Sequence, residues 1–173
     1  MRLALLAVAA LCAAPAAAAP PAPLPATVRN DLAALHAECR GYGGRPGAAR
    51  DLVKTADLNG DGLADHVVDL NAYNCEGAAS AMGAGQSGAA IKVYAGLLGG
   101  GAKLAFQTTA YGAKISPVGG RSRLWIETTG IDCGQRSQGV PFSDQTFCSR
   151  PLAWNPNRAV FVFAPLSEAK PIQ

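Results

Sequence analysis

Short runs of β-forming residues, separated by glycine-rich segments, fill the sequence from about residue 51 onward. The run SRLWIETTG alternates most clearly, and it predicts a half-buried strand with Leu124 and Ile126 on one face. The 20 glycines and 12 prolines of the chain favour many turns and argue against a helical bundle. Because strand and helix patterns do not alternate regularly, a doubly wound α/β fold is not expected.

One helix is predicted ahead of these runs. Apolar side chains recur at helical spacing between Val28 and Cys39, and Gly41 is expected to end the helix. We therefore predict an α+β fold, in which an N-terminal helix packs on an antiparallel β-meander of about six strands that carries two disulfides.

The first 19 residues have the pattern of a secretory signal peptide. Arg2 supplies the positive charge, residues 3–11 form an apolar run, and small residues lead to an A-x-A exit at residues 17–19. The apolar run is too short to span a bilayer as a helix, and the alternative interpretation is an uncleaved membrane anchor. We expect export from a bacterial cell, with the mature protein periplasmic or secreted.

The rest of the chain is expected to form one domain with short extensions. Residues 20–26 are proline-rich and predict an extended linker, residues 27–166 a single disulfide-bonded domain, and residues 167–173 a flexible tail. No second segment is apolar and long enough to cross a membrane, so we expect no membrane span after signal cleavage. The formal net charge of +3 is too small to predict a nucleic-acid surface.

Four cysteines follow the predicted signal peptide, and an even number in an exported chain predicts two disulfides. Four cysteines allow three pairings. Cys133 and Cys148 flank a polar, turn-rich stretch, so we favour that pair, and Cys39 would then bond to Cys75. The alternative is a metal or redox site, for which the sequence lacks a C-x-x-C spacing.

The stretch DLNGDGLAD, residues 57–65, is the most informative for chemistry. Oxygen-bearing side chains stand at its first, third, fifth and ninth places, and a backbone carbonyl lies at the seventh. Ca²⁺ binds about six to eight such oxygens, and a glycine at the sixth place permits the sharp turn that brings them together. The predicted Ca²⁺ ligands are Asp57, Asn59, Asp61, the Leu63 carbonyl and Asp65.

This stretch matches D-x-[DN]-x-[DN]-G over its first six places, but it departs from an EF-hand at the twelfth, where Val68 replaces a bidentate Glu. With β-type residues on both sides, it resembles the calcium loop of FG-GAP or VCBS (integrin-type) repeats, in a single copy that covers residues 52–70. The resemblance implies the same ligand set. A propeller needs several repeats, so the resemblance does not extend to the whole fold. The alternative is a polar hairpin turn that binds no metal.

Few other residues predict chemistry. His66 is expected on the surface, with its side chain directed away from Asp65, and the arginines are expected to be scattered and solvated. A Ca²⁺-dependent hydrolase would need Asp69 or Glu76 as a base, and neither has a partner at a suitable spacing.

The sequence therefore favours a non-enzymatic exported domain in which one structural Ca²⁺ makes a β-hairpin rigid. Its partner would be another envelope protein or a small ligand, with no role for nucleic acid. Two other hypotheses remain open. One is a small periplasmic inhibitor or immunity-like protein, and the other is the Ca²⁺-dependent hydrolase.

Overall fold

The computed structural model describes residues 23–49, 52–82, 85–136 and 139–172. The predicted signal peptide, residues 1–19, and the first part of the proline-rich linker lie outside the described residues. Within the described ranges, no helix is both long and apolar enough to span a membrane.

Helix α1 (Ala26–Gly41) confirms the predicted N-terminal helix. It begins one residue inside the predicted linker and directly after Pro25, whose ring fixes a backbone angle suited to the entry of a helix. Val28, Leu32 and Cys39 are buried along one side, as their helical spacing predicts.

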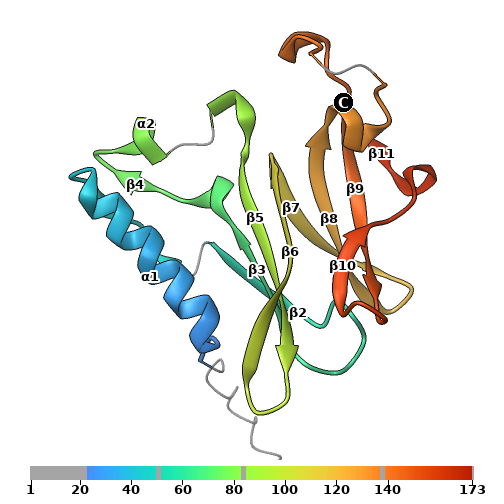
Figure 1. Ribbon diagram of the computed structural model, residues 1–173, viewed down its shortest axis with the longest axis horizontal. Helices are drawn as coiled ribbons and strands as arrows, with labels where there is room; N and C mark the ends of the chain where they lie inside the picture. Colours follow the sequence, from blue (N-terminus) through green and yellow to red (C-terminus); the bar gives the residue numbers. More distant parts are fainter. Residues whose placement is uncertain (1–22, 50–51, 83–84, 137–138, 173) are drawn as a thin grey trace, which may run out of the picture.

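Two antiparallel sheets form the body of the protein (Figure 1). The first sheet has the order β2-β3-β5-β6: Val53–Ala56, Asp65–Asp69, Ala89–Leu97 and Gly101–Ala110. The second has the order β7-β8-β9-β10: Gly112–Val118, Arg121–Thr129, Phe147–Asn155 and Val160–Phe163. Strand β11 (Lys170–Pro171) also pairs with β9, and β1 (Arg45–Pro46) pairs with β4 (Cys75–Glu76). Short helical segments are α2 (Ala79–Met82) and the 3₁₀ turns Leu70–Ala72, Gly85–Ser87, Gly130–Cys133, Phe142–Asp144 and Leu166–Glu168.

The antiparallel pairing and the single long helix agree with the prediction, but the strand number does not. The described residues form 11 strands in several sheets, where the sequence predicted about six. Strand β7 shows only a weak strand pattern in the sequence, because it contains Gly112 and Pro117. Strands β1, β4 and β11 have only two residues each, which is too short to show any periodicity.

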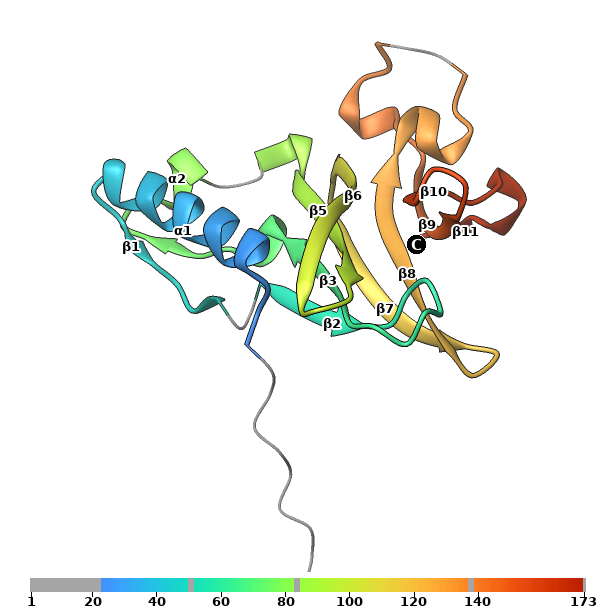
Figure 2. The same ribbon diagram turned by 60° about the horizontal axis from the view of Figure 1, so that its bottom comes forward.

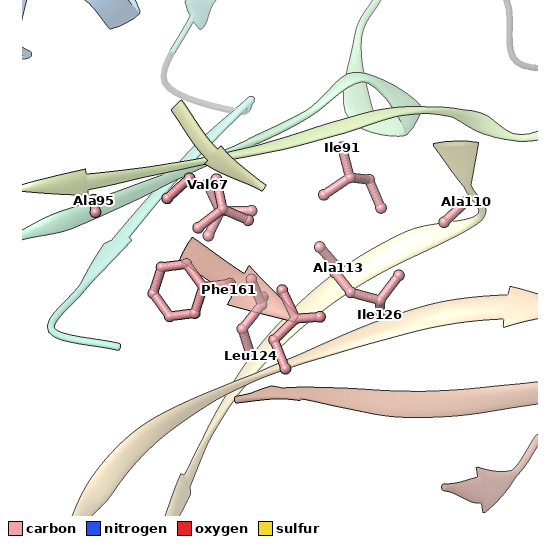
Figure 3. Packing of buried hydrophobic residues seen from close by; sticks show 11 residues of the cluster. Val67, Ile91, Ala95, Ala110, Ala113, Leu124, Ile126 and Phe161 are labelled. Carbon is pink, nitrogen blue, oxygen red and sulfur yellow. The ribbon is translucent and has the colours of Figure 1, made fainter. Parts of the chain in front are cut away.

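The main core lies between the two sheets (Figure 3). Val67 and Ile91 of the first sheet face Leu124, Ile126 and other apolar residues of the second. Helix α1 covers the opposite face of the first sheet, on the side away from the second sheet (Figure 1). Strand β3 therefore has neighbours on both faces, and all five of its residues are buried.

Polar contacts also hold α1 on the first sheet. The Asp31 carboxylate of α1 accepts hydrogen bonds from Lys92 Nζ at 2.8 Å and from the Tyr94 hydroxyl at 2.8 Å. Both partners belong to β5. Burial and the neighbouring Asp31 carboxylate raise the pKa of the Tyr94 hydroxyl, so this group remains a donor at ordinary pH.

Both disulfides join the cysteines that the sequence favoured. Cys39 at the end of α1 bonds to Cys75 in β4, and Cys133 bonds to Cys148 in β9. The first bond fixes the end of the helix to the body, and the second closes the segment between β8 and β9.

The C-terminal segment differs from the flexible tail expected at residues 167–173. Lys170 and Pro171 pair with Ser149 and Cys148 of β9, and Glu168 forms an ion pair with Arg123. Backbone pairing of this kind needs no hydrophobic pattern in the added segment, which is why the sequence SEAKPIQ gave no signal of a strand.

Candidate metal centre

The predicted calcium loop connects β2 to β3 at one end of the first sheet. Residues 57–64 form the connection between these antiparallel strands, which confirms the strand–loop–strand context. Gly60 and Gly62 have φ angles of +83° and +81°, which side chains with a Cβ rarely adopt. Leu58 packs against the main core and anchors the loop to it.

The first three predicted ligands bond to the backbone of the loop itself. Asp57 accepts hydrogen bonds from the N–H groups of Gly60 at 2.7 Å and Gly62 at 3.0 Å. Asn59 Oδ1 accepts from the backbone N–H of Asp61 at 2.9 Å, and its amide donates to Asp61 Oδ2 at 2.9 Å. Asp61 Oδ1 also accepts from the N–H two residues further along the chain at 2.8 Å. These bonds order the polar and glycine residues at the tip of the loop.

Asp65 lies apart from the other three, at the base of the loop. Its side chain is fully buried. Its Oδ2 accepts from the backbone N–H of Leu58 at 2.8 Å, and its Oδ1 accepts from the backbone N–H of Gly96 in β5 at 2.8 Å. This carboxylate therefore joins the loop to the first sheet.

Burial, backbone N–H groups and a second acid all act on the Asp65 carboxyl. Burial raises the pKa of the Asp65 carboxyl, while the N–H groups of Gly96 and Leu58 lower it in part. The Asp61 carboxylate raises it further. Within the described ranges, none of the three acids of the loop forms an ion pair with a basic side chain.

The described residues include no group of three or more His, Cys, Asp or Glu side chains arranged to hold a metal ion. Asp61 is exposed and Asp57 and Asn59 are half-buried, whereas Asp65 lies fully buried at the base of the loop. The predicted ligands therefore lie in one loop, but the carboxylates of Asp57, Asp61 and Asp65 do not converge on a common position.

Arg121 is a neighbour of the loop that the sequence did not indicate. The β7–β8 hairpin reaches the loop (Figure 2), and a cleft of about 230 Å³ lies between them. Asp57, Asn59 and Gly60 line one side, and Arg121 and Ser122 line the other. About 60 residues of chain separate the two sides, and no local pattern predicts such a contact between distant hairpins.

His66 is buried, which corrects the expected surface position. Its ring Nδ1 lies 3.2 Å from the Thr55 hydroxyl, and burial lowers its pKa while the adjacent Asp65 carboxylate raises it in part. Alternation along β3 does send His66 and Asp65 to opposite faces. His66 is nevertheless buried on the face of β3 to which it points. On that face it lines a mainly apolar cleft of about 340 Å³ beside the β5–β6 hairpin.

Asp69 and Glu76, the acids of the hydrolase hypothesis, have other contacts. Asp69 is buried, forms an ion pair with Lys54 at 3.1 Å, and accepts from the backbone N–H groups of Asn71 and Ala113 at 3.1 Å each. It thereby joins the first sheet to the second. Glu76 is exposed and pairs with Arg45 at 2.9 Å.

Comparison with known proteins gives no match to a family model, a curated protein or a solved structure.

Proposed function

We propose that this protein is an exported Ca²⁺-binding domain in which the ion makes the β2–β3 hairpin rigid. The observation that supports this most directly is the loop of residues 57–65, where oxygen side chains at alternate places are oriented by backbone N–H groups. Two disulfides and a signal-like N-terminus are consistent with export.

The donor set fits a hard cation. Asp57, Asn59, Asp61 and the Leu63 carbonyl offer only oxygen atoms, which Ca²⁺ prefers over nitrogen or sulfur ligands. Each carboxylate oxygen that accepts one N–H bond still has a lone pair for a cation. Asp65 would close the site from below, and the ion would offset the repulsion between its carboxylate and that of Asp61.

The domain would act as a binding module for an envelope protein or a small ligand. The loop forms one wall of the cleft against Arg121, so an ion that holds the loop in one conformation would also fix the shape of that cleft. A rigid wall lowers the entropy lost on binding, which is how a structural ion can support recognition without taking part in chemistry.

Thermal unfolding of the oxidised mature protein tests the proposal, in EDTA and across a CaCl₂ titration. At about 10 mM Ca²⁺ and a Kd of about 0.1–1 mM, the free energy of unfolding should increase by about 1.4–2.7 kcal/mol and Tm by about 3–10 °C. The variants Asp57→Ala and Asp61→Ala should lose this increase. Asp144→Ala, an exposed acid in another loop, is the matched control and should keep it.

An unchanged Tm at every Ca²⁺ concentration would contradict the proposal and leave the loop as a polar hairpin turn. The same conclusion would follow if the Ca²⁺-dependent increase in Tm persisted in both loop variants, because the ion would then bind elsewhere.

A further inference from the structure

The second sheet carries an unassigned cleft on the face turned away from the main core. Leu124 and Ile126 of β8 point into the core, so Trp125 between them faces outward. Trp125 lines a cleft of about 170 Å³ together with Lys114, Ser116, Ser149 and Lys170. These residues come from β7, β8, β9 and β11, and the sheet register brings them together.

The pairing of the strands explains this arrangement. Lys114 of β7 lies opposite Trp125, which itself lies opposite Pro151 of β9. Ser149 of β9 lies opposite Lys170 of β11. Strand β11 thus adds Lys170 to the face on which β7 already places Lys114.

Both lysines bring a positive charge to the cleft. Lys170 Nζ lies 4.3 Å from the centroid of the Trp125 ring, and in the described ranges neither lysine forms an ion pair with a carboxylate. Arg123 on the same face differs, since Glu168 pairs with it. Glu127 is the other acid on this face, two residues beyond Trp125, and it forms no ion pair with either lysine.

Uncharged donors surround the same cleft. Within the described part of the chain, the hydroxyls of Ser116 and Ser149 make no hydrogen bond to another residue. Trp125 is 8% exposed, and its buried Nε1 has no hydrogen-bond partner. The two serine hydroxyls are therefore the uncharged donors that line the cleft.

We propose that this cleft binds a phosphate group. Two lysines and two serines on three different strands line the cleft, and such a set of cationic and hydroxyl donors suits a tetrahedral oxyanion with four oxygens. The volume equals that of about six waters at roughly 30 Å³ each, which is enough for such a group. The source can be free phosphate or the phosphate of a lipid headgroup.

Isothermal titration calorimetry with inorganic phosphate tests the site, at constant ionic strength and in EDTA so that the calcium loop plays no part. Saturable binding at millimolar phosphate is expected, and it should weaken at least about tenfold in Lys114→Gln/Lys170→Gln. Lys103→Gln, on β6 of the first sheet, is the matched control and should bind as the unaltered protein does. Because Lys114 and Lys170 are exposed, the double variant should fold, and circular dichroism checks this.

A second readout uses the fluorescence of Trp125. In a Trp154→Phe background this is the only tryptophan, and phosphate should change its emission with the same midpoint as the calorimetric titration. Sodium acetate should bind at least about tenfold more weakly than phosphate. Equal binding of acetate, equal binding by the double variant, or a response that follows ionic strength alone would each overturn the proposal.

Vesicles distinguish the two sources of phosphate. Binding to phosphatidylglycerol vesicles but not to phosphatidylcholine vesicles, lost in the double variant and kept in Lys103→Gln, would assign the site to a lipid headgroup. Phosphate binding without vesicle binding would assign it to free phosphate or a small phosphate ester.

Discussion

The carboxylate of Asp65 accepts a buried hydrogen bond of 2.8 Å from the backbone N–H of Gly96. This bond fixes the base of the β2–β3 loop to the end of β5. The approach is close, because a Cβ added at Gly96 would lie 2.6 Å from the Ala64 carbonyl oxygen and 3.1 Å from Leu63 Cβ. The position of the candidate calcium loop thus depends on a glycine in another strand.

Gly96→Ala should therefore destabilise the protein by about 1–3 kcal/mol, because the added methyl group overlaps the loop backbone. Urea unfolding in EDTA measures the effect. Gly41→Ala is the matched control, since a Cβ at Gly41 meets no atom within 4 Å, and this variant should be at least as stable as the unaltered protein. Equal stability of the two variants would contradict the close approach at Gly96.

Arg121→Gln should strengthen Ca²⁺ binding about two- to fivefold, because it removes a positive charge from the wall opposite the loop. Arg121→Lys keeps the charge and should leave the affinity close to its original value. Calorimetric titration with CaCl₂ compares the three proteins. A weaker affinity in Arg121→Gln would mean that the guanidinium supports the loop and does not oppose the ion.

Removal of either disulfide should destabilise the protein, and removal of Cys39–Cys75 should cost more. The two bonds span 36 and 15 residues, for which the chain-entropy model gives about 4 and about 3 kcal/mol. Urea unfolding of the two Cys→Ser pairs measures the difference. A larger loss for Cys133–Cys148 would show that native packing at that bond outweighs the entropy of the unfolded chain.

His66 should make the stability depend on pH near neutrality. Its folded-state pKa lies below the ordinary 6.5, chiefly because it is buried. The unfolded chain therefore takes up the proton first, so the stability that neutral His66 contributes is complete above about pH 6.5 and is lost as the pH falls through the folded-state pKa.

The variant His66→Gln should show a smaller loss of stability between about pH 7 and pH 5, measured by urea unfolding in EDTA. His36→Gln leaves His66 in place and should keep the loss seen in the unaltered protein. An identical pH profile for His66→Gln and the unaltered protein would contradict the assignment to this side chain.

Elements with a strong local pattern could be predicted from the sequence. The helix followed from the spacing between Val28 and Cys39. Both disulfides followed from the even number of cysteines after the predicted signal peptide and from the turn-rich stretch before Cys148. The β2–loop–β3 context also followed, because alternate oxygens and two glycines define the turn locally.

Properties that depend on how the helix and the two sheets pack against one another could not be predicted from the sequence. Strand β3 lies between α1 and the second sheet, so burial on both faces removes the alternation that would have revealed the environment of His66 and Asp65. The approach of Arg121 to the loop and of Lys170 to Trp125 depends on how distant hairpins meet, which residue spacing does not encode.

The order β7-β8-β9-β10 in the second sheet is also the order along the chain, with each strand antiparallel to the one before it. Such a sheet can assemble one hairpin at a time, because short turns join β7 to β8 and β9 to β10, whereas residues 130–146 separate β8 from β9. The docking of α1, far from its partner strand β5 in sequence, is the long-range step. Folding is therefore expected to be quick in the C-terminal half, with oxidation of Cys39 and Cys75 following the arrival of the helix.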